Sequence, residues 1–427
     1  MKTSTCSHFL APAHALVATL LLGACGAAQV PSGAKYKLTL VKLPDSASCG
    51  KVDEVSNFSI NNTSAVFMRA TCGTWPLDRS VVLKNNVVVA DIAERGSRVN
   101  GVTSNNLGSI AYGYRGKDRK LQARLNNSEL GPVDSAFMAL RSNRDEVVFF
   151  RDEQLMAASS AGETRALLKA GMQLDGGVIK SVTESSSPGY PLILSVSNDD
   201  AVAHCEVQRG GEPVRGLCTT SKFLPSENVS DASVNNQGDI AYSEEVYSTD
   251  QASLTTTVKT TAGAQLGHAL IGGWGSDGDL VTSCPGEDQV NRLRYSNVCE
   301  KEGWVRILSH DGKKTEIVVR QADLVPLVAT PSTVATILNV KVLSVNAKKE
   351  FVASVTYTLT DKNAKGFRIS GVGTQRDSPF LKEVGTPEET GSPCTANLDC
   401  STKTVMDSAS SVGRATLPSA SRKNSSA

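Results

Sequence analysis

The chain has 427 residues, and its 44 Lys and Arg nearly balance its 43 Asp and Glu, which gives a formal charge of +1 at neutral pH. This balance excludes the strong basic surplus typical of nucleic-acid-binding domains, so we expect no nucleic-acid partner. Hydrophobic residues make up 40% of the chain and aromatic residues only 5%. That composition predicts an ordered core of aliphatic side chains, in two average domains or one large β architecture.

The N-terminus has the features of an export signal. Lys2 precedes an apolar run from Ala15 to Leu22, which is too short to span a bilayer permanently. The run ends in Leu22-Gly23-Ala24-Cys25, which resembles the lipobox of bacterial lipoproteins. The resemblance implies that residues 1–24 are a lipoprotein signal peptide, and that Cys25 becomes the acylated first residue, carrying palmitate-type chains into the membrane.

The N-terminal segment allows two interpretations, and each implies a different localisation. Residues 25–34 would form a lipidated tether, and Gly26 in place of Asp implies, by the same resemblance, the outer membrane in a diderm cell. The other interpretation is an ordinary secretory signal cleaved after Ala28, which would release a soluble secreted protein. Both place the chain outside the cytoplasm.

The cysteines predict disulfides. Of the ten, Cys6 leaves with the signal and Cys25 is the lipid site, and the other eight fall as close neighbours in sequence. We therefore expect four local bridges in an oxidising compartment: Cys49–Cys72, Cys205–Cys218, Cys284–Cys299 and Cys394–Cys400. A zinc site is the competing interpretation, but the sequence has no CxxC pair, and we expect neither a metal nor another cofactor. His204 beside Cys205 is not a predicted catalytic pair, because adjacent strand residues point to opposite faces.

A short pattern recurs, in which a polar turn precedes a β-branched or aromatic run. It is clearest at 104–112 and 234–242, and weaker copies lie at 60–67, 141–149, 274–281, 345–353 and around 187–193. The first β-branched positions of the runs are residues 66, 110, 147, 193, 240, 280 and 351. Five of the six spacings match one four-stranded propeller blade, and the long last spacing is explained by an insertion closed by Cys284–Cys299.

Other segments fit the same architecture. Strands are expected at 80–90, around an Asn85-Asn86 turn, and at 254–261, while a helical signal is confined to 162–170. The alternating residues 35–43 are predicted to supply the strand that closes the ring. The sequence thus predicts an all-β chain with a single β-propeller of seven blades.

The recurring pattern resembles the repeats of bacterial extracytoplasmic β-propellers, in which an Asn-x-x-Gly turn precedes an Ile/Val-Ala-Phe/Tyr strand. This resemblance implies one propeller domain over residues 35–386. The alternative is a pair of β-sandwiches with recurrent hairpins. The Ser/Thr-rich tail, residues 387–427, is expected to be mostly disordered.

Motifs that would carry chemistry are scarce. The sequence contains no GxSxG, HExxH, Walker A or GxGxxG motif. Asp277 and Asp279 lack the further oxygen ligands of a calcium loop and are interpreted as turn residues. The tryptophans, Trp75, Trp274 and Trp304, are expected in the core beside disulfides. The acidic pairs are expected in solvated turns rather than in a glycosidase dyad: Asp152-Glu153, Asp199-Asp200, Glu244-Glu245 and Glu388-Glu389.

The sequence therefore predicts a lipid-anchored cell-envelope β-propeller that serves as a binding or assembly scaffold, with a protein or glycan partner and no catalytic residues. The alternatives are a carbohydrate-active or other hydrolytic propeller enzyme, and a soluble secreted binding protein. An enzyme would bring together two or more ionisable groups with perturbed pKa values. A scaffold would instead expose apolar or aromatic side chains.

Overall fold

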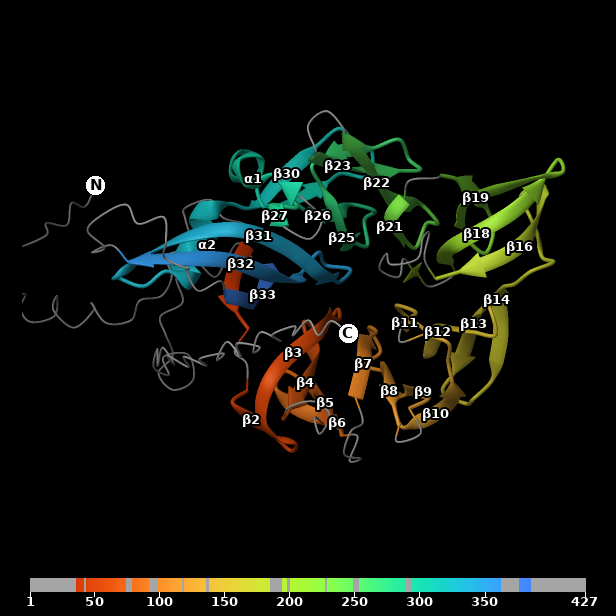
Figure 1. The fold of residues 1–427 in the computed structure, drawn as a ribbon, viewed down its shortest axis with the longest axis horizontal. Coiled ribbons are helices and arrows are strands. Elements are labelled where there is room, and N and C mark those ends of the chain that lie inside the picture. The colour runs from red at the N-terminus through yellow and green to blue at the C-terminus, as the bar shows by residue number, and fades with distance from the viewer. Residues whose placement is uncertain are drawn as a thin grey trace, which may run out of the picture. The chain divides into compact units, whose positions relative to one another are not determined.

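The computed structural model describes residues 36–41, 44–73, 79–91, 98–116, 119–135, 138–184, 194–197, 200–226, 229–248, 253–288, 293–361 and 376–384. All of these belong to one compact unit (Figure 1). The predicted signal peptide, Cys25 with its tether, Trp75, Glu388-Glu389, the Cys394–Cys400 pair and the tail lie outside the described residues.

The described residues form seven antiparallel sheets of four or more strands. Sheet 1 contains β2 (Ser46–Ala47), β3 (Gly50–Ile60), β4 (Val66–Cys72), β5 (Arg79–Lys84) and β6 (Val87–Asp91). Sheet 2 contains β7 (Arg98–Ser104), β8 (Ile110–Arg115), β9 (Leu121–Leu125) and β10 (Ser128–Pro132). Sheet 3 contains β11 (Ala139–Leu140), β12 (Glu146–Arg151), β13 (Gln154–Ser159) and β14 (Thr164–Leu168).

Sheet 4 is the largest, with β15 (Gln173–Leu174), β16 (Gly177–Thr183), β17 (Ser195–Val196), β18 (Ala201–Arg209), β19 (Glu212–Cys218) and β20 (Phe223–Pro225). Sheet 5 contains β21 (Val229–Val234), β22 (Ile240–Ser248), β23 (Ser253–Thr260) and β24 (Gln265–Gly267). Sheet 6 contains β25 (Leu270–Trp274), β26 (Leu280–Ser283), β29 (Val305–Leu308) and β30 (Thr315–Val319).

Sheet 7 joins the two ends of the described chain. It contains β31 (Thr333–Val345), β32 (Phe351–Asp361), β33 (Arg376–Val384) and, as its outer strand, β1 (Tyr36–Leu40). The pairing is antiparallel, with Tyr36 opposite Val384 and Leu40 opposite Phe380. The predicted closing strand at 35–43 is thus confirmed as a partner of the last described strand.

The sheets follow one another as the blades of a β-propeller. The strands β3, β7, β11, β17, β21, β25 and β31 contact one another in this order, and β31 in turn contacts β3. Seven clusters of buried side chains lie between neighbouring sheets, each shared by one pair: sheets 1 and 2, 2 and 3, 3 and 4, 4 and 5, 5 and 6, 6 and 7, and 7 and 1. The predicted all-β propeller arrangement is confirmed, and the pair of sandwiches is not what the chain forms.

The blades have two distinct ends. The turns 61–65, 105–109, 235–239, 275–279 and 346–350 follow the inner strands, and we call the end that carries them the turn face. The opposite end, where β4 and β26 finish, carries two disulfides and the helices α1 (Ser296–Glu302) and α2 (Gln321–Val328), and we call it the disulfide face. The Asn85-Asn86 hairpin also forms as predicted, with both residues at positive φ.

The insertion in sheet 6 is confirmed. Residues 284–304 form an insertion between β26 and β29, which pair directly with each other. The insertion contains α1 and a two-stranded sheet of β27 (Glu287–Asp288) and β28 (Leu293–Arg294). Neither α1 nor α2, the helices of the described part of the chain, has the length and apolar character needed to cross a membrane.

Two local predictions were wrong in detail. The expected helix at 162–170 is the outer strand β14, because Leu167 and Leu168 pack into the core between sheets 3 and 4 and tertiary burial overrides local propensity. The fourth repeat was placed at residue 193, which lies outside the described residues. The equivalent strand of sheet 4 begins at Ala201, directly after Asp200, whose carbonyl accepts a hydrogen bond from Ser197 N–H.

Candidate functional site

Buried asparagines organise the turn face. Asn61, Asn105, Asn235 and Asn346 each begin a turn and are at most 5% exposed. In each case the side-chain Oδ1 accepts hydrogen bonds from the backbone N–H groups two and four residues later, as Asn346 does from Lys348 and Glu350 at 3.0 Å each. The recurring sequence pattern is therefore a turn that carries its own side-chain cap.

Three of these side chains also join neighbouring sheets. Asn346 Nδ2 donates to the carbonyl of Asn61 (2.7 Å), Asn61 Nδ2 donates to the carbonyl of Asn105 (3.3 Å), and Asn105 Nδ2 donates to the carbonyl of Arg144 (2.9 Å). A series of hydrogen bonds thus runs from sheet 7 through sheets 1 and 2 to sheet 3. Sequence reasoning identified the turns but missed these links; the signal available was an asparagine at the same place in four copies of the pattern.

Sheets 5 to 7 carry charges at the same face, in what we call the charged cluster: Asp239, Asp277, Asp279, His310 and Lys349. Lys349 Nζ lies 2.5 Å from Asp277 Oδ2 and 3.0 Å from Asp279 Oδ2. His310 donates its backbone N–H to Asp279 Oδ1 (3.1 Å), and its Nδ1 lies 3.8 Å from Asp239 Oδ2. Asp277 and Asp279 are thus turn residues held by an ammonium group, as the sequence favoured over calcium ligation.

The charged cluster lies within electrostatic range of the N-terminal strand. Burial opposes ionisation of Asp277 most strongly, but the hydrogen bond and charge of Lys349, together with hydrogen bonds from backbone N–H groups, outweigh it and hold the Asp277 pKa below its ordinary value. The pKa of Tyr36 is raised, chiefly by burial, and further by the negative charges of Glu316, Asp277 and Asp279, which Lys349 opposes. Tyr36, the first described residue, therefore lies near the turn-face end of sheets 6 and 7.

The inner strands are joined by hydroxyl groups. Ser59 and Ser104 are hydrogen-bonded across sheets 1 and 2 (2.8 Å), and Ser195 and Ser233 across sheets 4 and 5 (3.1 Å). Half-buried Asp231 lies on β21 among these inner strands. Burial raises its pKa to about 6, although the N–H of Ala232 and Lys341 act in the opposite direction.

An open pocket of about 430 Å³ lies beside α1, between β24 and the outer strands of sheet 6. Its polar lining includes His268, Glu302 and Arg306. The buried guanidinium of Arg306 is already engaged, because it donates to Glu302 Oε2 (2.8 Å) and to the carbonyls of Gly267 and His268. This arginine thus fixes α1 and the end of sheet 5 against sheet 6.

Three of the four predicted disulfides are formed. The bonded pairs are Cys49–Cys72, Cys205–Cys218 and Cys284–Cys299, with Cα–Cα distances of 5.7, 5.7 and 5.6 Å. Each closes a short stretch of chain within one sheet, which is why sequence proximity was enough to pair them. Among the described residues no group of three or more His, Cys, Asp or Glu side chains is arranged to hold a metal ion.

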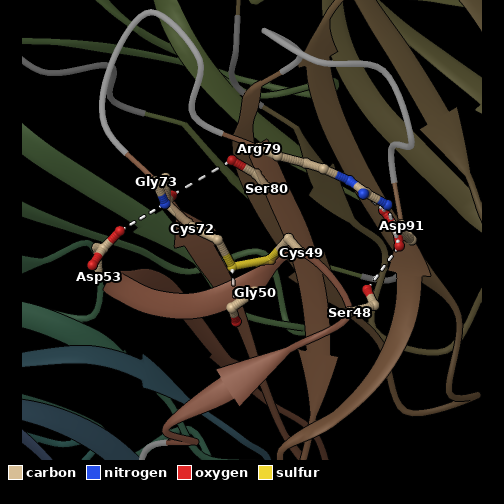
Figure 2. Close-up of a disulfide and its surroundings, with 10 residues drawn as sticks. Ser48, Cys49, Gly50, Asp53, Cys72, Gly73, Arg79, Ser80 and Asp91 are labelled. Carbon is tan, nitrogen blue, oxygen red and sulfur yellow. Dashed lines mark hydrogen bonds and ion pairs between the residues drawn. A yellow bond between two sulfur atoms is a disulfide. The ribbon is translucent and has the colours of Figure 1, made fainter.

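Figure 2 shows how the first bridge is supported. Asp53 accepts the backbone N–H of Gly73 (2.6 Å) just after Cys72, which secures the end of β4. Asp91, at the end of β6, accepts from both Arg79 (2.6 Å) and Ser48 (2.7 Å). Partial burial opposes ionisation of Asp91, but these hydrogen bonds lower its pKa. Strands β3 to β6 are therefore tied together at the disulfide face.

Other residues singled out in the sequence have structural roles. His204 is buried next to the Cys205–Cys218 bridge, and burial lowers its pKa to about 4, so it is neutral at physiological pH. Asp200 accepts from the N–H and hydroxyl of Thr220 (2.7 and 2.6 Å) and joins the segment after β19 to the start of β18. Trp304 is fully buried with Cys284 and Cys299 in the core between sheets 6 and 7, as predicted, whereas Trp274 is only partly buried.

Comparison with known proteins adds little beyond the architecture. No family model matches the chain, and no curated protein sequence matches it. The chain is similar to the solved structure of YCF48 bound to D1 peptide (10% identity, 84% of this chain, 97% of that one, TM-score 0.40). It is also similar to the β-propeller domain of the trilobed protease from Pyrococcus furiosus (10% identity, 66% of this chain, 99% of that one, TM-score 0.32).

A third similar structure is the gluconolactonase XC5397 from Xanthomonas campestris (9% identity, 82% of this chain, 90% of that one, TM-score 0.30). Likenesses this distant carry no argument about what the present chain binds or catalyses. The class that its own geometry defines is a disulfide-bonded β-propeller.

Proposed function

We propose that this protein is a lipid-anchored, seven-bladed β-propeller of the cell envelope that acts as a binding scaffold. The blade number is supported by the seven multi-stranded sheets and by the seven buried clusters, each shared by two neighbouring sheets. A ring of seven blades has seven interfaces, and the cluster between sheets 7 and 1 is the one that closes it.

The extracytoplasmic location is supported by the bonded cysteines, since disulfides persist in oxidising compartments. The lipid anchor is supported by the lipobox resemblance at Cys25 and by the position of β1. Cys25 precedes Tyr36 by 11 residues, so the proposed anchor is attached almost directly to the strand that completes sheet 7.

The observation that carries the binding role is the composition of the disulfide face. Val178, Val246 and Val334 are 37, 58 and 49% exposed, and each lies near the end of its strand on this side. The pocket beside α1 opens among the same sheets as Val246. Apolar side chains left exposed at the same end of the molecule as a concave site are typical of a surface that docks a partner, here a protein or a glycan.

The anchor is tested by metabolic labelling with a fatty acid. Wild type and Cys6→Ala should incorporate the label, whereas Cys25→Ala should not, because Cys6 belongs to the segment that is removed. Equal labelling of Cys25→Ala and wild type would refute lipidation.

The scaffold role is tested by isolating the protein from native membranes after chemical crosslinking. Val246→Asp should lose the partner species that wild type retains, while Thr164→Asp, at an exposed position on β14 of sheet 3, should keep it. A partner recovered equally with both variants would contradict docking at the disulfide face.

A second function, hydrolysis, is favoured by one observation: the raised pKa of Asp231 at the inner edge of the propeller. A carboxyl group that titrates near 6 is suited to proton transfer near neutral pH. The test is turnover of a panel of nitrophenyl esters and glycosides by wild type and Asp231→Asn. Activity lost in the variant would support the enzyme, and no turnover by wild type would reject it for these substrates.

A further inference from the structure

We propose that the rim of the turn face on blades 7, 1 and 2 lies against the lipid headgroups, so that the disulfide face points away from the membrane. This inference rests on the proposed lipid anchor at Cys25. It specifies what the anchor alone leaves open, namely which surface of the propeller meets the bilayer.

The position of Tyr36 carries the first step. Leu38 pairs with Lys382, and Lys382 pairs with Phe351, the first residue of β32 after the turn 346–350. Tyr36 precedes Leu38 by two residues on β1, on the side toward the turn face, and is therefore level with the turn 346–350. The electrostatic influence of Lys349, Asp277 and Asp279 on Tyr36 places it at the same end. The chain from Cys25 thus joins the propeller at the turn-face end of blade 7.

The length of that connection carries the second step. An extended chain spans at most about 3.6 Å per residue, so the 11 residues from Cys25 to Tyr36 reach no further than roughly 40 Å. The β32 strand, with 11 residues, has roughly the same length of about 36 Å. The tether therefore keeps the turn-face rim of blade 7 near the bilayer. If the disulfide face lay against the lipid instead, the tether would have to run fully extended along the whole length of the blade.

Exposed apolar side chains give independent support. Seven large apolar residues of the described chain are exposed, and five of them lie on blades 7, 1 and 2. Val334 of blade 7 is at the disulfide face, and the other four are Leu40, Val87, Val89 and Leu107, which are 45, 66, 41 and 61% exposed. Val87 directly follows the Asn85-Asn86 turn and pairs with Lys84. Lys84 in turn pairs with Phe67, near the start of β4, so Val87 lies at the turn face. Leu107 lies within the turn 105–109, and Leu40 pairs with Phe380, which is opposite Ala353 near the start of β32.

These positions suit contact with the headgroup region. Shallow burial of a few aliphatic side chains strengthens attachment to a bilayer, and it does not require a large positive charge, which a chain with a formal charge of only +1 does not have. The acyl chains supply the affinity, and the apolar rim selects the side on which the propeller rests.

Two matched valines allow a direct test. Val87 and Val246 are both exposed strand residues, 66 and 58%, but they lie at opposite ends of their blades. Val87→Cys and Val246→Cys are each labelled with a fluorophore in the oxidised, acylated full-length protein and reconstituted into vesicles that contain a headgroup-linked quencher. Intact mass confirms a single label on each.

We expect quenching at position 87 to be several-fold stronger than at position 246, and a probe introduced by Leu107→Cys to behave like the one at 87. Equal quenching, or stronger quenching at 246, would overturn the orientation while leaving the anchor intact. Vesicle flotation separates the two proposals: wild type should float and Cys25→Ser should not. If wild type fails to float, the anchor is refuted and the orientation falls with it.

Discussion

The side-chain amide of Asn346 donates a hydrogen bond of 2.7 Å to the backbone carbonyl of Asn61, 285 positions earlier in the chain. The same asparagine caps its own turn through Oδ1. One side chain therefore shapes the last described turn of the pattern and fastens the last sheet to the first.

Replacing Asn346 with alanine should lower the free energy of unfolding by about 1–3 kcal/mol, because the carbonyl of Asn61 and the backbone N–H groups of Lys348 and Glu350 lose their partner. The measurement is a urea unfolding curve. The control, Asn127→Ala at an exposed turn position, should change stability by no more than about 0.5 kcal/mol. Identical midpoints for the two variants would show that the Asn346 link does not stabilise ring closure.

A glycine pair probes the packing of sheet 6 on sheet 7. A Cβ atom at Gly272 would lie 2.6 Å from Val342 Cγ1 and 2.9 Å from the carbonyl oxygen of Val281, whereas one at Gly267 meets no atom within 4 Å. Gly272→Ala should therefore cost about 1–3 kcal/mol through overpacking. Gly267→Ala should be close to neutral, and a loss of similar size in both variants would contradict the close approach of the two sheets.

The raised pKa of Asp231 predicts a pH-dependent cost to stability. Because its pKa is about 6 in the folded chain and about 3.9 when unfolded, the carboxylate opposes folding above pH 6 and has no effect below about pH 4. Asp231→Asn should therefore stabilise the protein at pH 7.5, by an upper limit of about 3 kcal/mol, since part of the side chain stays accessible.

Unfolding midpoints of wild type and Asp231→Asn between pH 4 and 8 check this expectation, and the advantage of the variant should vanish toward the acidic end. Asp134→Asn, at an exposed site, serves as the control and should show no such trend. A constant difference between wild type and Asp231→Asn across the range would exclude titration of Asp231 as the cause.

The Cys284–Cys299 bridge should contribute about 3 kcal/mol, the value expected for a loop of this length. The double variant Cys284→Ala, Cys299→Ala should unfold at lower urea concentration, and the fluorescence of fully buried Trp304 should report the change. Intact mass should rise by eight hydrogens on reduction of wild type, if all four predicted bridges are present, and by six for the variant. An unchanged unfolding midpoint would show that the bridge is dispensable.

The parts of the fold that follow from local chemistry were predictable. A turn that begins with asparagine or ends with glycine, followed by a β-branched run, specifies a hairpin over about ten residues, and the pattern at 104–112 and 234–242 located the corresponding strands. Where the local signal was ambiguous the prediction was wrong, as at Thr164–Leu168, whose two leucines become strand residues because a neighbouring sheet buries them.

The candidate site could be predicted only in its disulfides. The bonded pairs are separated by 23, 13 and 15 positions, so a single sheet, together with the turns and the insertion that connect its neighbouring strands, brings each pair together. Lys349 meets Asp277 and Asp279, which lie 72 and 70 positions away, and no pattern within one repeat indicates which repeat will be its neighbour.

The sequence by itself determined the repeating strands, the pairing of neighbouring cysteines and the strand that joins the two ends, because each depends on interactions between residues close in the chain or on a simple alternation of side chains. Only the tertiary structure decided that the turn asparagines join adjacent sheets, that Tyr36 lies beside the charged cluster, and that Asp231 is poorly solvated. The physical reason is that closing the circle of sheets places residues hundreds of positions apart within hydrogen-bonding distance. It also removes water from polar side chains whose burial cannot be read from their neighbours in the sequence.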